Sequence, residues 1–152
     1  MEVTILTSDA ILEEWIVDAP LDKLDLEKSA RESSSLHAKY MRYFIYAHRA
    51  YNKALKRYKK IIDLRTQYIE GKLNNKDDLT ALQWEPYLFE SPTFKEYDRV
   101  IGRFPDVIEM TKTLGEAKLT LDTVVSILKE IANRNYLVRA AIDMRKFELG
   151  KS

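Results

Sequence analysis

Apolar and polar positions along much of the chain follow the spacing of a helix. From residue 40 the apolar or aromatic residues recur in alternating steps of four and three, as they do on one face of a long helix. A serine at 33, 34 or 35 is suited to cap its start, and Gly71 to end it in a left-handed turn, so we predict a long helix over residues 33–71. The stripe comprises Tyr40, Phe44, Ala47, Tyr51, Ala54, Tyr58, Ile61, Arg65 and Tyr68.

A second stripe with the same period predicts another long helix over residues 105–133. The triplet Asn133-Arg134-Asn135 then interrupts the period, and asparagine tolerates the left-handed conformation in which helices stop. We therefore predict a separate C-terminal helix over residues 136–149. The second stripe comprises Val107, Met110, Leu114, Ala117, Leu121, Val124, Leu128 and Ile131, and the last helix carries Leu137, Ala140, Ala141, Met144 and Phe147 on one side.

The remaining segments are less regular. Residues 72–104 read as short helices and loops, in which Ser91 and Pro92 are suited to begin a short helix that ends near Gly102. Residues 1–32 form an acidic N-terminal segment. A chain of 152 residues with four glycines and four prolines is typical of one helical domain, and we expect an all-α fold of long antiparallel helices.

Helices of this length carry more apolar stripe than one hairpin covers. Self-association through helix packing is one way to bury the rest, and a monomeric bundle whose middle helices cover the stripes is the alternative.

Charge is unevenly distributed although the net charge is only +1. Residues 1–32 hold nine acidic and three basic residues, whereas residues 33–65 hold nine basic residues and one acid, Asp63. A face without acids indicates a polyanionic partner more than a merely solvated surface. The opposite face is a Tyr and Ala seam, so an anionic membrane is disfavoured. The basic face comprises Lys39, Arg42, Arg49, Lys53, Lys56, Arg57 and Lys60.

Catalytic chemistry is poorly represented in the sequence. There are no cysteines, and the two histidines, His37 and His48, lie about 16 Å apart along a helix axis, too far to share one metal. The C-terminal Gly-Lys-Ser imitates a phosphate-binding loop, but Arg145 stands where the first glycine is required. We predict a protein that is not an enzyme and has no cofactor or metal. The absence of cysteines fits a reducing interior, so we expect a cytoplasmic protein. The N-terminus carries acids where a secretory signal carries Lys or Arg, so we expect a soluble, unprocessed chain.

Three stretches give the chain a family resemblance from about Leu36 to the C-terminus. They are "LHAKYMR" at 36–42, "QYIEGK" at 67–72, and "LKEIANRNYLVRAAIDMRKFELGK" at 128–151. Together they resemble the UvsY family of tailed-phage recombination mediator proteins. In the last stretch the matching residues are Ile131, Arg134, Ile142, Asp143, Met144, Arg145, Phe147, Glu148, Gly150 and Lys151.

The resemblance implies a non-enzymatic factor in DNA recombination, repair and replication that acts in the cytoplasm of an infected host cell. Members of the family are all-helical, assemble into ring-like homo-oligomers, bind single-stranded DNA, and help a RecA-like recombinase load onto strands coated with single-strand-binding protein. A helical adaptor whose basic face binds an acidic protein partner is the alternative. In that case the acidic N-terminus is itself a candidate to cover the basic helix of its own or a neighbouring subunit.

The resemblance also implies site residues. The family has a basic pair just ahead of the Tyr-x-x-Gly turn. Arg65 matches the second member of the pair. The first member falls on Asp63, so a positive charge is missing at this position, and the basic residues upstream can supply it. The predicted DNA-binding residues are Lys53, Lys56, Arg57, Lys59, Lys60 and Arg65. The predicted self-association residues, on the C-terminal segment, are Leu137, Ala141, Met144 and Phe147.

Overall fold

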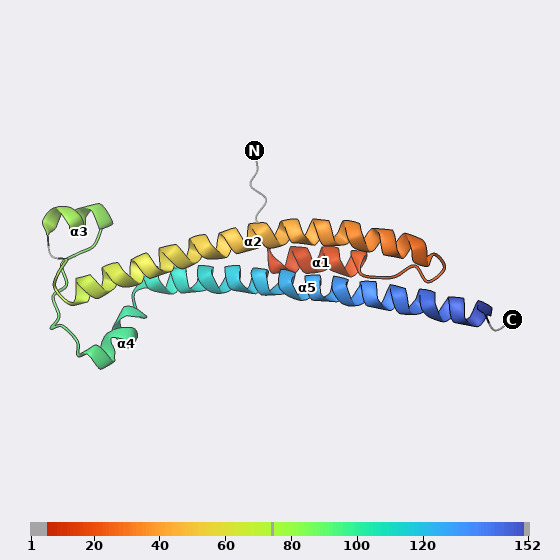
Figure 1. Cartoon of the computed structure of the whole chain (residues 1–152). Helices are drawn as coiled ribbons and strands as arrows, with labels where there is room; N and C mark the ends of the chain where they lie inside the picture. The colour runs from red at the N-terminus through yellow and green to blue at the C-terminus, as the bar shows by residue number, and fades with distance from the viewer. Residues whose placement is uncertain (1–5, 74, 151–152) are drawn as a thin grey trace. The chain divides into compact units, whose positions relative to one another are not determined.

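The computed structural model describes residues 6–73 and 75–150, and every regular element in those ranges is helical. The all-α prediction is therefore confirmed. Lys151, which the family resemblance includes, lies outside the described residues. In chain order the elements are α1 (Ser8–Asp18), α2 (Leu26–Ile69), α3 (Lys76–Leu82), the 3-10 helix η1 (Phe94–Glu96), α4 (Tyr97–Ile101) and α5 (Pro105–Gly150) (Figure 1).

The chain forms two compact units, and both long helices contribute to each. The first unit contains residues up to 50 and from 117 onward, and the second contains residues 51–116. Within the first unit α1 lies alongside α2 and α5, which run in opposite directions (Figure 1).

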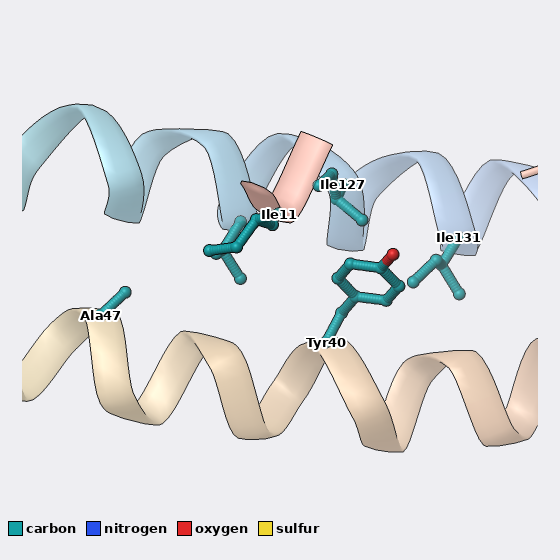
Figure 2. Close-up of a cluster of buried hydrophobic side chains, with 6 residues drawn as sticks. Ile11, Tyr40, Ala47, Ile127 and Ile131 are labelled. Atoms are coloured by element: carbon teal, nitrogen blue, oxygen red, sulfur yellow. The ribbon is translucent and has the colours of Figure 1, made fainter. Parts of the chain in front are cut away.

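The core of the first unit forms where α1, α2 and α5 meet. Tyr40 and Ala47 from α2 pack with Ile127 and Ile131 from α5, and Ile11 is the contribution of α1 (Figure 2). The Tyr40 ring is fully buried and reaches across to α5. Burying a side chain of this size contributes about 1.5–3 kcal/mol, so these contacts hold the three helices together.

The core of the second unit gathers around the end of α2. Tyr68 and Ile69 are buried there with Leu79 of α3, Ile101 of α4 and Val107 of α5. Partly buried side chains, including Trp84 and Phe104, pack against this cluster. One shared apolar cluster thus holds together the end of α2, the short helices α3 and α4, and the start of α5.

Both predicted stripes are confirmed as packing faces. Every described member of the two stripes is buried or partly buried, and the exposed positions between them are mostly polar. The alternating steps of three and four therefore located the buried faces correctly, although they did not locate all the helix ends.

The start of α2 differs from the prediction, because the helix begins at Leu26 and not near Ser33. The side chain of Asp25 accepts a hydrogen bond from the backbone N–H of Lys28 at 2.9 Å, which is the geometry of an N-terminal cap. Ser33 is buried inside the helix, and its hydroxyl donates to the carbonyl oxygen of Ser29 at 2.9 Å. The predicted serine cap is wrong since Asp25 supplies the capping oxygen two turns earlier.

The predicted break at residues 133–135 is also wrong, because α5 continues without interruption from Pro105 to Gly150. Ile131, Arg134 and Val138 are buried on one face of the helix, at the spacing of successive turns. Burial of this face outweighs the weak helix propensity of the two asparagines. The C-terminal residues are accordingly the end of α5, and no separate helix covers 136–149.

Two further helix ends test the turn predictions. Gly71 has a φ of +76°, and the N–H of Lys72 donates to the carbonyl of Gln67 at 2.9 Å, so the left-handed stop after α2 is confirmed. Gly102 follows the end of α4, as predicted. Ser91 and Pro92 do not begin a helix: η1 starts later, at Phe94.

Candidate nucleic-acid interface

The predicted basic face of the second unit is open to solvent. Five of the predicted DNA-binding residues lie along α2 in this unit, all of them are exposed, and within residues 6–73 and 75–150 none of them is in an ion pair. Their charges are therefore not neutralised by the described part of the chain. They are Lys53, Lys56, Arg57, Lys59 and Lys60; we call them the basic strip.

The geometry of the basic strip suits a flexible polyanion. Lys53, Lys56, Arg57 and Lys60 occur at the spacing that places side chains on one helix face, with Lys59 at its border. The buried residue Ala54 lies on a different face of the same helix, in the packing seam. Long side chains that extend from a smooth helix can reach phosphates at variable positions, but they form no fixed hydrogen-bonding pattern that would read bases.

Arg65 is placed differently from the basic strip. It is only 7% exposed, and its guanidinium donates to both carboxylate oxygens of Asp106, with nitrogen–oxygen distances of 2.9 to 3.2 Å. The guanidinium carbon also lies 3.7 Å from the ring centre of Trp84 and 4.0 Å from that of Phe104. The positive charge is thus paired and covered by aromatic rings. A DNA contact by Arg65, implied by the resemblance, remains a prediction, whereas this structure gives the side chain a role in the core.

Asp106 stands at the start of α5, where a carboxylate also interacts favourably with the helix dipole. Its side chain accepts a hydrogen bond from the N–H of Val107 at 2.8 Å. The Arg65 pair therefore connects the end of α2 to the start of α5 within the second unit. The sequence contained one sign of this role, because Arg65 occupies a position of the packing stripe.

Asp63, the single acid among the basic residues, is exposed. The side-chain amide of Gln67, one turn further along α2, donates to the Asp63 carboxylate at 3.1 Å. Within the described residues the carboxylate forms no ion pair with the basic strip. The local positive charge of the strip is consequently reduced by Asp63 but not cancelled.

In the first unit the acidic α1 meets the beginning of the basic helix. Lys39 lies 2.7 Å from a carboxylate oxygen of Asp18 and 3.2 Å from one of Glu14, and its pKa is raised, chiefly by the hydrogen bond to Asp18. Tyr43 donates to Glu14 at 2.7 Å, which raises the pKa of its phenol. The acidic segment thus neutralises Lys39, a member of the predicted basic face, while Arg42 and Arg49 of the same face remain exposed.

The comparisons with known proteins decide the family. The family model described as "Recombination, repair and ssDNA binding protein UvsY" matches residues 14–151. The chain belongs to the UvsY family. The match begins well before Leu36, where the resemblance in sequence starts, and it includes the α1 residues Glu14 and Asp18. The family description names no catalytic activity.

Solved structures show the same fold. Two crystal structures of the bacteriophage T4 recombination mediator protein UvsY superpose with TM-scores of 0.81 and 0.80, each at 19% sequence identity. The first alignment covers 98% of both chains, and the second covers 93% of this chain and 99% of the other. No curated protein matches this chain in sequence.

The described residues contain neither a candidate metal site nor a membrane-spanning helix. Across residues 6–73 and 75–150 no group of three or more His, Asp or Glu side chains is arranged to hold a metal ion. Over the same ranges no helix is long and apolar enough to cross a membrane.

Arg134, one of the family-matching residues, anchors α1 in the first unit. It is 4% exposed, and it donates to the backbone oxygen of Asp18 at the end of α1 at 2.8 Å. A second guanidinium nitrogen lies 3.6 Å from a carboxylate oxygen of Glu32. Sequence reasoning did not assign this role, although the position of Arg134 between the buried Ile131 and Val138 indicates that its side chain faces the core.

The predicted self-association residues lie along the last turns of α5. Leu137, Met144 and Phe147 are 48%, 60% and 58% exposed, and Ala141 between them is half-buried. Large apolar side chains at this spacing form an exposed stripe along the end of α5. We call these four residues the C-terminal stripe.

Proposed function

We propose that this chain is a recombination mediator that binds single-stranded DNA and promotes loading of a RecA-like recombinase onto strands coated with single-strand-binding protein. The observation that carries the proposal is the basic strip, five exposed cationic side chains without ion-pair partners in the described residues of a UvsY-family chain. Family membership supports the recombination context, and the strip supplies the charge for binding a strand.

Binding by the basic strip would be driven largely by counterion release. Each phosphate that a Lys or Arg neutralises frees condensed cations, so affinity falls with salt and depends little on base sequence. Members of the strip such as Lys56 and Lys60 have no fixed partner in the described residues, and no existing contact has to break before they reach a phosphate. Arg65, held by Asp106, would have to give up that ion pair first.

Self-association would multiply these weak contacts. We propose that the C-terminal stripe packs against other copies of the chain in a ring-like homo-oligomer, in which many basic strips face one strand. Linked sites hold a ligand far more tightly than one site does, while individual contacts still exchange. An oligomer of this kind can hold a strand extended and leave it accessible to the recombinase, in the cytoplasm of the infected host cell.

Charge removal from the basic strip tests the DNA-binding part of the proposal. For the wild type, the binding constant for an unstructured oligonucleotide should fall with salt, with a logarithmic slope of about −0.7 for each phosphate contacted. The variant Lys53→Ala, Lys56→Ala, Arg57→Ala, Lys60→Ala should bind at least about tenfold more weakly and with a shallower slope, because it releases fewer counterions. Fluorescence anisotropy at several salt concentrations measures both quantities.

A control variant removes three cationic side chains elsewhere, one fewer than the test variant. Lys112, Lys118 and Lys129 are exposed on α5, and their replacement by Ala should change the affinity much less. Circular dichroism checks that all variants stay helical. A wild type that does not bind at low salt would overturn the proposal. It would favour the adaptor alternative, in which the basic strip meets an acidic protein.

A further inference from the structure

An exposed apolar segment lies between α3 and α4 and has no part in the basic strip. Leu88, Phe89 and Phe94 are 88%, 78% and 86% exposed, although each side chain is large and apolar. Leaving such side chains in water forgoes the free energy that burial would provide, so several of them close together in the sequence mark an interaction site. We refer to residues 84–97 as the 84–97 segment.

The 84–97 segment is fixed to the second unit near both of its ends. The Tyr68 hydroxyl donates a hydrogen bond to the backbone oxygen of Glu85, and the Tyr87 ring lies 5.3 Å from that of Tyr68. At the other end the rings of Phe94 and Tyr97 are 5.5 Å apart, and Tyr97 is partly buried against the core of the second unit. The exposed side chains are therefore presented from a held segment, which lowers the ordering cost of binding.

The backbone of this segment is available to a partner. Within the described residues, no backbone N–H of residues 85–91 donates a hydrogen bond to another part of the chain. Pro86 and Pro92 favour extended backbone for the residues before them. Backbone N–H groups without a partner in the chain can donate hydrogen bonds to a partner protein, while exposed apolar side chains of the same segment anchor in its groove.

The charge of the segment excludes the strand itself as its partner. Residues 84–97 contain three acidic residues, Glu85, Glu90 and Glu96, and one basic residue, Lys95. Glu96 is in an ion pair with Arg99 at 3.7 Å, so within the described residues Glu85 and Glu90 provide the unpaired negative charge. A phosphate backbone would be repelled, whereas a protein with an apolar groove edged by Lys and Arg would be attracted. The segment is thus opposite in charge to the basic strip. It suits a partner protein that itself binds DNA, because such a protein has a basic surface.

We propose that the 84–97 segment docks the RecA-like recombinase, with Leu88, Phe89 and Phe94 as its apolar anchors. This inference rests on the proposed function, which brings two DNA-binding proteins to the same strand. The strand-coating protein arrives with its basic surface already filled by DNA. The recombinase arrives with that surface unoccupied, so charge complementarity favours the recombinase.

The test uses the full chain and the purified RecA-like recombinase of the same phage, without DNA. The variant Leu88→Ala, Phe89→Ala, Phe94→Ala should bind the recombinase at least about tenfold more weakly, because truncation of interface anchors is costly. Its affinity for an oligonucleotide should remain within about twofold of the wild type, since the segment is acidic. The charge variant Glu85→Gln, Glu90→Gln, Glu96→Gln should also weaken recombinase binding and make it less sensitive to salt.

The control variant is Ile108→Ala, Leu119→Ala, which truncates apolar side chains that are 54% and 57% exposed on α5. It should bind the recombinase as the wild type does. Unchanged recombinase binding by the triple Ala variant, or an equal loss in the control, would overturn the inference. It would also be overturned if the triple variant lost only affinity for single-strand-binding protein, or only oligomer mass by light scattering. Failure of the wild type to bind DNA would instead count against the proposed function.

Discussion

At the scale of single residues, Arg65 is a charged side chain at a position of the packing stripe, where apolar or aromatic residues are the rule. A cation in a packing stripe is costly unless its charge is paired and its donors are satisfied. Asp106 supplies the pairing in a bidentate geometry, and the rings of Trp84 and Phe104 pack against the guanidinium. The stripe position predicted that the side chain faces the core. The partner could not be predicted, because it lies 41 residues away along the chain.

We expect Arg65→Met to lower the free energy of unfolding by about 3 kcal/mol, because it leaves the Asp106 carboxylate without its partner in a partly buried site. Asp106→Asn should destabilise the protein in the same direction, and the double variant should lose less than the sum of the two. Chemical denaturation measures these changes. Affinity for an oligonucleotide, measured well below the unfolding transition, should change little.

The opposite result would assign Arg65 to the DNA surface. If Arg65→Met kept its stability but made the salt dependence shallower by about 0.7, the guanidinium would reach one phosphate. In that case Asp106→Asn, which releases the guanidinium, should strengthen binding. The two variants therefore separate a role in the core from a direct contact.

At the scale of elements, the attachment of α1 depends on Asp18. Its carboxylate accepts hydrogen bonds from Lys39 at 2.7 Å and from the Tyr40 hydroxyl at 3.0 Å, and its backbone oxygen accepts one from Arg134. Burial, with the hydrogen bond to Asp18, raises the pKa of the Tyr40 phenol above its ordinary value of 10.0. The pKa of Lys39 is likewise above 10.5, chiefly because of its hydrogen bond to Asp18.

These shifts predict that the first unit loses stability at alkaline pH. Both groups keep their protons more tightly in the folded chain, so the stability they contribute is present below pH 10 and is lost as the pH rises above it. Tyr40→Phe removes the phenol, and it should lower the melting temperature at pH 8. Its curve should approach that of the wild type between about pH 10 and 11.5. Thermal unfolding followed by circular dichroism measures both.

Tyr46→Phe is the control, because Tyr46 is 50% exposed on the same helix. It should follow the wild-type pH dependence throughout. A constant difference in melting temperature between Tyr40→Phe and the wild type from pH 8 to 11.5 would contradict the assignment of Tyr40 as a titrating contributor.

The elements also show which parts of the fold can be predicted from sequence. Periodicity found both packing faces, because burial follows the turn of the helix. It missed the start of α2, since Asp25 competes with the serines as a cap, and it placed a false break at Asn135, where burial of Arg134 and Val138 maintains α5. The apolar residues of the 84–97 segment follow no helical or strand period, so the sequence pattern did not predict that their side chains are exposed.

At the scale of the whole molecule, oligomerisation is best tested by substitution within the C-terminal stripe. Truncation before Asn133 would also remove Arg134 and Val138, which belong to the packed face of α5, and a smaller assembly could then result from unfolding. The exposed positions Leu137 and Met144 can be changed without touching that face.

We expect Leu137→Gln, Met144→Gln, Phe147→Gln to reduce the mass measured by light scattering, because polar side chains weaken an apolar contact between copies. Leu119→Gln changes an equally exposed residue of α5 outside the stripe, and it should leave the mass unchanged. A triple variant with the wild-type mass would refute the stripe as the self-association surface. Helicity measured on the same samples distinguishes lost contacts from lost folding.

If the basic strip binds the strand as proposed, its length limits how much DNA one copy can hold. Lys53 and Lys60 are separated by seven residues of helix, or about 11 Å at 1.5 Å per residue. Phosphates along a strand are at least about 3.4 Å apart, so one strip would face at most about three nucleotides. The five cations of one strip can contact only those few phosphates, so a longer oligonucleotide would bind a single copy with little additional affinity. The footprint on DNA would then grow by at most about three nucleotides for each copy bound, so the length of strand that an assembly protects would indicate its number of subunits.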